Sequence, residues 1–137
     1  MDVQDISLVT QKKVPDDCSL LIEYGPQSDL RDSEKTVIMD YLKKGGTAIL
    51  MPVYEEKETP NIDEILDYYG MSIQKGIIYE GVGHYENYLN WIVPTINTDA
   101  DVMSKFGDKD YVVIGSSQGI KEQKSPSLRN GLKLTDI

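Results

Sequence analysis

The sequence predicts an α/β fold in which an open, mostly parallel sheet carries helices on both faces. Between residues 20 and 79, apolar segments and helix-like segments follow in the order strand, helix, strand, helix, strand. This order is typical of parallel strands joined by crossover helices. The strand segments "CSLLIEYG" and "TAILMPV" carry apolar runs that fit a sheet covered on both faces. At 137 residues the chain has the length of one domain.

The first segments predict two strands with a turn between them. Val3, Ile6, Leu8 and Val9 alternate imperfectly with polar residues, which predicts a strand at residues 3–9. Pro15 and the two aspartates after it indicate a turn. The next strand, at residues 20–24, ends at Gly25-Pro26.

The helix expected at residues 32–44 has signals at both ends. Its apolar positions recur at helical spacing along one stripe, and they are Leu30, Val37, Ile38, Tyr41 and Leu42. Asp32 or Ser33 can cap its N-terminus by accepting a backbone N–H. Gly45 can adopt the left-handed conformation that ends many helices.

The remaining elements become harder to predict toward the C-terminus. A strand at residues 47–53 precedes a second helix, which we expect to begin at Asn61 with Glu64 as its capping partner. Apolar residues predict further strands at 77–79 and 111–117. The segment between them reads as an irregular connection with a short helix near residues 100–105.

Composition excludes several classes of function. Acidic side chains number 23 and basic ones 14, for a net charge of -9, which argues against a nucleic-acid partner. Cys18 is the only cysteine, so neither an internal disulfide nor a cysteine-based metal cluster is expected. No apolar run approaches the roughly 20 residues of a membrane span. We expect a single α/β domain over residues 1–137, as a fragment of a longer, membrane-anchored protein.

Right-handed crossovers place the loops after parallel strands at one edge of the sheet, where ligands of such folds bind. The sequence therefore predicts a contact surface for a ligand or partner at that edge. Its candidate residues are Gly25, Pro26, Gln27, Ser28, Tyr54, His84, Tyr85, Ser116 and Ser117.

Two residues are candidate nucleophiles. Ser117 is central in "GSSQG", which matches the G-x-S-x-G nucleophile elbow, but no helix signal and no histidine follow it. Cys18 opens a strand, whereas a catalytic thiol needs an activating base beside it. We therefore predict no catalytic residue, and a hydrolase-like or amidotransferase-like enzyme using Ser117 or Cys18 stays the alternative.

Metals and cofactors are not predicted either. His84 is the only histidine, which is a weak signal for a metal site. The glycine patterns of nucleotide-binding loops are absent, and Pro26 removes a backbone donor from the first loop. The cluster of Tyr79, Tyr85, Tyr88 and Trp91 fits either core packing under a loop or a binding surface. A sugar- or nucleotide-binding module that stacks its ligand on these rings is a further alternative.

Most of the chain between Val3 and Glu80 resembles a known family, the auxiliary component of an uncharacterised type of ABC transport system, similar to a gliding-motility-associated substrate-binding-like protein. The matching positions are Val14-Pro15, Gly25-Pro26, Glu34, Gly45-Gly46, Leu66, Tyr69-Gly70, Ile73 and Gly76. The chain departs from the family pattern at Arg31, where a serine or threonine cap is usual, and at "DADV", where a histidine-containing stretch is expected.

This resemblance implies a non-enzymatic, substrate-binding-like accessory domain on the extracytoplasmic face of the cell membrane. It implies a flavodoxin-like or class I glutamine amidotransferase-like sheet without catalytic residues. The implied partners are the permease and ATPase subunits of an ABC transporter, with a small-molecule ligand as a further possibility. Membrane attachment would come only through segments outside this chain.

Overall fold

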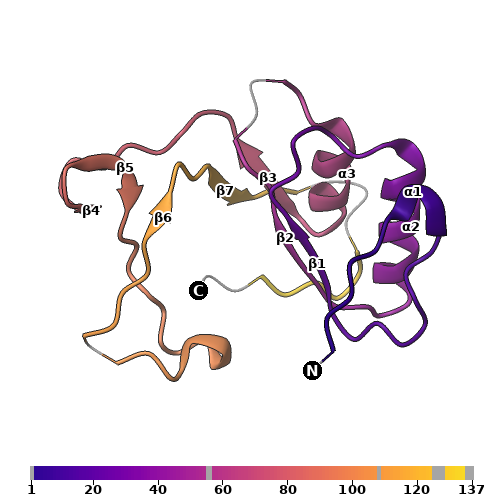
Figure 1. Ribbon diagram of the computed structural model, residues 1–137. Coiled ribbons are helices and arrows are strands. Elements are labelled where there is room, and N and C mark those ends of the chain that lie inside the picture. Colours follow the sequence, from indigo (N-terminus) through magenta and orange to yellow (C-terminus); the bar gives the residue numbers. More distant parts are fainter. Residues whose placement is uncertain (1, 55–56, 108, 125–128, 135–137) are drawn as a thin grey trace. The chain divides into compact units, whose positions relative to one another are not determined.

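The computed structural model describes residues 2–54, 57–107, 109–124 and 129–134. The chain forms two compact units, Met1–Leu66 and Asp67–Ile137, which we describe in turn (Figure 1). The first unit contains α1 (Leu8–Gln11), β1 (Leu21–Tyr24), α2 (Asp32–Lys43), β2 (Ala48–Met51) and most of α3 (Pro60–Tyr68). The expectation of a single domain stays a prediction.

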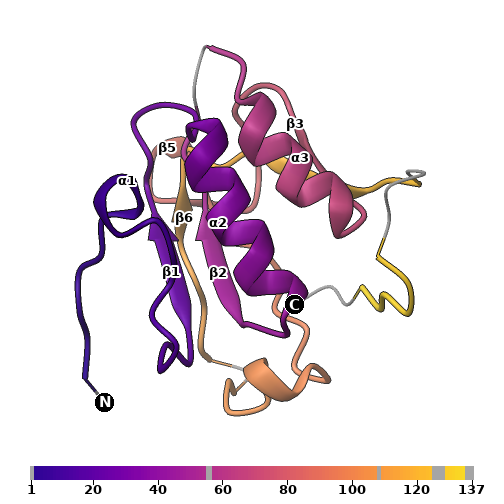
Figure 2. The same ribbon diagram turned by 90° about the vertical axis from the view of Figure 1, so that its right-hand side faces the viewer.

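In the first unit β1 and β2 form a parallel pair, as the sequence predicts. Leu21 is paired with Ala48 and Tyr24 with Met51. The Leu21 N–H donates to the Thr47 carbonyl at 2.9 Å, and the Gly25 N–H donates to the Met51 carbonyl at 3.1 Å. Helix α2 makes the crossover and lies along one face of the pair (Figure 2). The strands are therefore covered on one side by their own connection.

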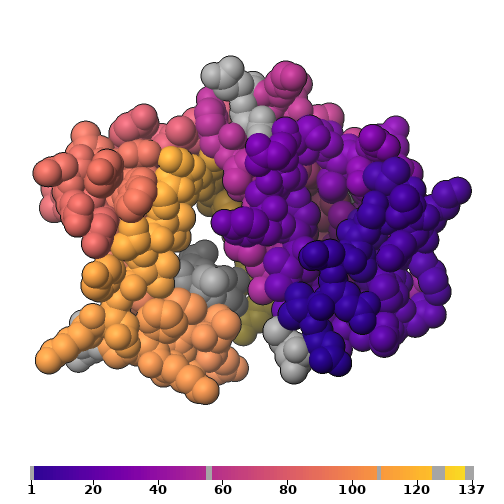
Figure 3. All heavy atoms as spheres, viewed as in Figure 1, coloured from indigo at the N-terminus to yellow at the C-terminus, as the bar shows by residue number. Residues whose placement is uncertain are grey.

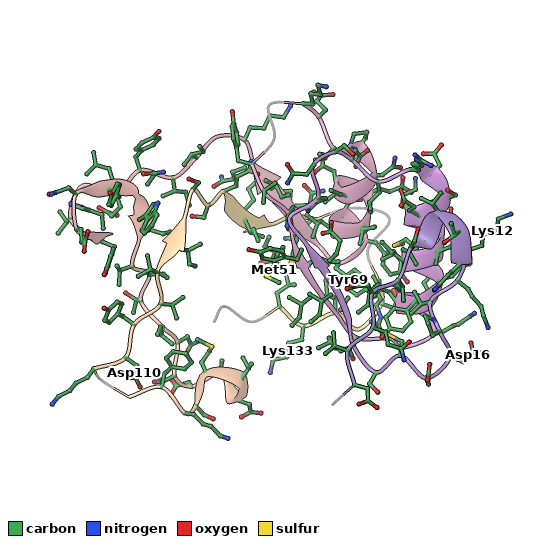
Figure 4. All side chains as sticks on the ribbon, viewed as in Figure 1. Lys12, Asp16, Met51, Tyr69, Asp110 and Lys133 are labelled. Carbon is green, nitrogen blue, oxygen red and sulfur yellow. The ribbon has the colours of Figure 1, made fainter. Side chains whose placement is uncertain are left out.

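Burial along β1 alternates, so the prediction of strands buried on both faces is wrong. Leu21 is buried, whereas Ile22 and Tyr24 are 52% and 82% exposed. On β2, Ile49 and Met51 are exposed in the same way, and Figure 4 labels Met51. Because neighbouring side chains of a strand point to opposite faces, one apolar face of the pair is left open.

Helix α2 confirms the helix predicted at residues 32–44. Its N-cap is Arg31, and not Asp32 or Ser33 as expected; the Glu34 carboxylate accepts the Arg31 N–H at 2.9 Å. At the other end Gly45 has a φ of +94°. Its N–H donates to the Leu42 carbonyl and the Gly46 N–H donates to the Tyr41 carbonyl. These two bonds form a Schellman motif, so the predicted role of Gly45 is confirmed.

The core of the first unit lies on the inner faces of α2, α3 and β1. Its buried apolar side chains include Val14, Leu21, Ile38, Leu42, Ile62, Ile65 and Leu66. The strand expected at residues 3–9 does not form, because Leu8–Gln11 is one turn of helix. The Ser7 carbonyl accepts the N–H groups of Thr10 and Gln11 and the Thr10 hydroxyl. These local bonds compete with strand pairing.

The second unit is built from antiparallel pairs. β3 (Met71–Gln74) pairs with β7 (Gly119–Glu122), and β5 (Tyr88–Ile92) pairs with both β4 (His84–Tyr85) and β6 (Ile114–Gly115). The short helix predicted near residues 100–105 is confirmed as the 3₁₀ turn η1 (Asp101–Met103). The strand predicted at 77–79 is wrong, and that at 111–117 is reduced to β6.

The pairings overturn the predicted fold class. Among the described residues β1 and β2 are the only parallel pair, and every other pairing is antiparallel. The chain is therefore not an open, mostly parallel sheet of the flavodoxin or amidotransferase type. The prediction extended the strand–helix–strand pattern of the first unit to a third parallel strand at residues 77–79, which does not form; the strand that follows α3 is β3, and it pairs antiparallel with β7. Within the described ranges no helix is long and apolar enough to cross a membrane.

Candidate functional site

The predicted edge site divides between the two units. Gly25, Pro26, Gln27, Ser28 and Tyr54 belong to the first unit, and His84, Tyr85, Ser116 and Ser117 belong to the second. Only the first group follows parallel strands. There the loops do meet, because a Cβ at Gly25 would stand 3.7 Å from Val53 Cγ1. The residues of the second group belong to antiparallel strands or to the loops next to them. The parallel arrangement that would bring all nine residues to one edge is therefore absent from the described chain.

The loop after β1 is tied to the helix α3 through Asp29. One carboxylate oxygen of Asp29 accepts the Asn61 N–H at 3.0 Å, and the other accepts the Ile62 N–H at 3.2 Å. The Asn61 side-chain amide donates to the Leu30 carbonyl at 2.7 Å. Asp29 thus satisfies N–H groups in the first turn of α3, which helices normally leave unpaired. These bonds give residues 25–30 a structural role.

Glu64 does not serve as the capping partner that the sequence predicts for α3. Its carboxylate instead accepts a hydrogen bond from Lys35 Nζ of α2 at 2.5 Å. This hydrogen bond raises the pKa of Lys35, and the negative charges of Glu64, Asp32 and Asp29 raise it further. The remote Asp29 has taken the capping role, and Glu64 links the two helices.

Ser117 does not lie in a nucleophile elbow. The "GSSQG" segment joins β6 to β7, so a strand follows it where the elbow requires a helix. Ser117 Oγ and His84 Nδ1 are both buried and make no hydrogen bond to any described residue, so the two are not bonded to each other. The base that would activate this serine is therefore not in place.

Ser116 has a structural function at the same corner. Its φ is +52°, a conformation that residues other than glycine seldom adopt. The Ser116 N–H donates to the Asn90 carbonyl at 2.7 Å, and Asn90 Nδ2 donates to Ser116 Oγ at 2.9 Å. Asn90 on β5 therefore holds the turn at which the chain passes from one sheet to the other.

Cys18 is a free, half-buried cysteine in the turn before β1. Its carbonyl oxygen lies 3.3 Å from the hydroxyl of Tyr41, which can donate to it. Burial raises the pKa of the Tyr41 hydroxyl above its usual value. The bond from Tyr41 thus engages the backbone of Cys18 and fixes the turn before β1.

A carboxylate of the chain itself accepts a hydrogen bond from the backbone of the "GVG" segment. Glu80 accepts the Val82 N–H at 3.0 Å. The backbone N–H groups of Val82 and Gly83 lower the pKa of Glu80 below its usual value, because they stabilise the charged form. These donors are therefore already used. In the described ranges no group of three His, Cys, Asp or Glu side chains could hold a metal ion.

Four aromatic side chains of the second unit form a continuous surface, which we call the aromatic array: Tyr85, Tyr88, Trp91 and Tyr111. The Tyr88 and Trp91 ring centroids are 5.0 Å apart, those of Trp91 and Tyr85 are 6.3 Å apart, and those of Tyr85 and Tyr111 are 6.4 Å apart. The planes of neighbouring rings differ by 29° or less. The four rings are therefore stacked one against the next in the order Tyr88, Trp91, Tyr85, Tyr111.

The array is held by the three-stranded sheet. Tyr85 and Tyr88 are paired across the two-residue turn of the β4–β5 hairpin, and Trp91 is paired with Gly115 of β6. A Cβ at Gly115 would stand 3.3 Å from Trp91 Nε1, so the glycine gives the indole room to lie against the neighbouring strand. Figure 3 shows the hairpin and the segment containing β6 next to each other at the surface of the second unit.

Exposure decides between the two interpretations of these aromatic residues. Tyr88, Trp91 and Tyr111 are 52%, 41% and 60% exposed. They are therefore not core packing beneath a loop. The sequence grouped Tyr79 with them, but no ring contact joins Tyr79 to the array in the described part of the chain. Tyr111 was missed, although it opens the segment predicted as a strand at 111–117.

Comparison with known proteins gives one structural likeness. No family model matches the chain, and no curated protein matches it. Among solved structures the chain is similar to the N-terminal domain of mmIFT52, with a TM-score of 0.58 and 18% sequence identity. The match covers 77% of this chain and 49% of the other, so the chain spans about half the length of that structure. This likeness concerns the fold alone, and it is to a domain other than the flavodoxin-like type that was expected.

Proposed function

We propose that the chain is a non-catalytic protein-binding domain and that the aromatic array is its contact surface. The observation that carries the proposal is the row of roughly parallel rings on β4, β5 and the segment before β6, three of which, Tyr88, Trp91 and Tyr111, are exposed. Tyrosine and tryptophan are enriched among the residues that dominate binding energy at protein interfaces. Their rings offer a large contact area with few rotatable bonds to immobilise.

The positions of the candidate nucleophiles support a non-catalytic role. Ser117 lies between two strands and makes no hydrogen bond to a described base, and Cys18 has a tyrosine hydroxyl beside its carbonyl. The small-molecule alternative, a sugar or nucleotide stacked on the rings, predicts that such a ligand raises the unfolding temperature. A thermal-shift screen with sugars and nucleotides tests this alternative separately.

Association with an ABC transporter is the more specific form of the proposal. It rests on the resemblance of residues 3–80 to the transporter auxiliary family, and placement on the extracytoplasmic face belongs to the same proposal. The permease and the ATPase subunits would then be the partners. The contact would again use the array on β4, β5 and the segment before β6.

Site-specific crosslinking in the native cell tests the proposal. A photoreactive phenylalanine analogue replaces Tyr88 in the array or, as a control, Tyr24 in the first unit; both tyrosines are exposed. We expect a protein adduct from position 88 that Trp91→Ala abolishes, with the crosslinked segment identified by mass spectrometry. Absence of any adduct that depends on Trp91 would contradict the proposed function. Adducts that never contain transporter subunits would overturn only its transporter form.

A further inference from the structure

We infer that the aromatic array binds an arginine-containing basic segment of a partner protein, an inference that rests on the proposed function and names the partner's chemistry. The first support is the identity of the surface groups. Guanidinium groups are planar and weakly hydrated, and they stack on the faces of tyrosine and tryptophan. The two end rings of the row, Tyr88 and Tyr111, each stack on one neighbour of the array only, and both are exposed, so each can offer a face to a guanidinium group.

The charge around the array is the second support. Residues 76–104 contain no lysine or arginine, and they contain the acidic residues Glu80, Glu86, Asp99 and Asp101. Within this stretch lie three of the four array residues. A cationic segment therefore meets only negative charge from these residues, whereas an acidic segment or a nucleic acid is repelled; Lys105 and Lys109 lie before the fourth array residue, Tyr111.

Two carboxylates stand next to array residues in the chain. Glu86 is exposed in the hairpin turn between Tyr85 and Tyr88. Asp110, which Figure 4 labels, immediately precedes Tyr111. Its carboxylate accepts the Gly107 N–H at 2.8 Å. One acid thus lies in the turn between Tyr85 and Tyr88, and the other is next to Tyr111 in the chain. They supply the acceptors that guanidinium groups prefer for charge-assisted hydrogen bonds.

The second unit already uses this type of contact within itself. The guanidinium carbon of Arg129 lies 5.8 Å from the centroid of the Tyr69 ring. An arginine from outside would make the same kind of contact with rings that are now exposed to solvent. Lysine carries the same charge but lacks the planar group, so it should bind less tightly.

Trp91 provides the readout, because it is the only tryptophan of the chain. The full chain is titrated with short peptides in which glycine and serine alternate with arginine, lysine or glutamate, and Trp91 fluorescence is recorded. We expect a saturable change with the arginine peptide, weaker binding of the lysine peptide, and no binding of the glutamate peptide. Added salt should weaken the interaction, since part of it is electrostatic.

Paired variants locate the site. Tyr88→Ala and Glu86→Gln should each weaken binding of the arginine peptide about three-fold. Tyr24→Ala and Glu122→Gln, which change exposed residues outside the array, should leave it unchanged. Circular dichroism spectra that match the parent chain show that each variant is folded.

No saturable change with the arginine peptide up to about 1 mM overturns the inference. Equal binding by the lysine peptide also overturns it, as does preferential binding of the glutamate peptide or of single-stranded DNA. If position 88 crosslinks to a protein in cells while the arginine peptide does not bind, the proposed function stands and the basic partner is excluded.

Discussion

The ring of Tyr41 occupies the space that a Cβ at position 46 would need. Its Cε1, Cζ and Cε2 atoms all lie within contact of that place. The ring is also fixed at its end, because the Tyr41 hydroxyl accepts the Thr47 N–H at 3.2 Å and can donate to the Thr47 carbonyl at 3.0 Å. The close approach of the Tyr41 ring therefore requires a glycine at position 46. Gly46 also ends the helix together with Gly45.

Gly46→Ala should therefore destabilise the first unit. Because the Tyr41 ring must move and lose its hydrogen bonds, we expect a loss of about 2 kcal/mol in the free energy of unfolding. Urea unfolding followed by the helical signal in circular dichroism measures it, since the long helices lie mainly in this unit. Gly81→Ala is the control, because nothing lies within 4 Å of the added Cβ. A similar stability for both variants would show that Tyr41 can be displaced at little cost.

Some residue roles could be predicted from the sequence and others could not. Gly45 was predictable because a glycine that follows the last turn of an amphipathic helix has a known local geometry. The cap of α3 was not, because Asp29 lies 32 residues before Asn61 in the chain. A local pattern points to Glu64 instead, and only the folded chain shows that Lys35 holds it.

Asp29 connects two elements, and its removal should loosen the start of α3. Asp29→Ala leaves the N–H groups of Asn61 and Ile62 without their acceptors, so we expect a loss of about 1–2 kcal/mol in unfolding free energy. Asp29→Asn keeps one acceptor oxygen and should lose less. Thermal unfolding by circular dichroism compares the two. Equal losses for alanine and asparagine would contradict the capping role.

At the scale of elements, helices and strands differ in how well the sequence specifies them. The apolar stripes and end signals of α2 and α3 lie within a few residues of one another, so these helices were predicted. The β4–β5 hairpin was missed because its first turn residue, which has a φ of +53°, is Glu86. Glycine or asparagine at that position would have indicated a hairpin turn. The pairing of β3 with β7 joins Gln74 to Gly119, and no local pattern indicates so distant a partner.

The predicted fold class was wrong because the described residues contain only one pair of parallel strands. The apolar runs of β1 and β2 suggested burial on both faces, yet Ile22, Tyr24, Ile49 and Met51 are exposed. The candidate site depended on the same assumption, because only parallel strands bring successive loops to one edge. The aromatic array was predicted in part. The sequence analysis named three of its four rings, but their order and exposure depend on the antiparallel hairpin, which was not predicted.

At the scale of the whole molecule, the hydrogen bonds of β1 predict which of its backbone amides exchange slowly with deuterium. The amides of Leu21 and Gly25 donate toward β2, and alternate amides of a strand point to opposite sides, so those of Ile22 and Tyr24 point away from it. We expect slow deuterium uptake at Leu21 and Gly25 and fast uptake at Ile22 and Tyr24, measured by nuclear magnetic resonance. Uniform rates along the strand would contradict this pairing. If a strand of a partner paired with the free edge of β1, deuterium uptake would become slower at Ile22 and Tyr24 alone. The uptake rates of these four amides would therefore detect such a partner.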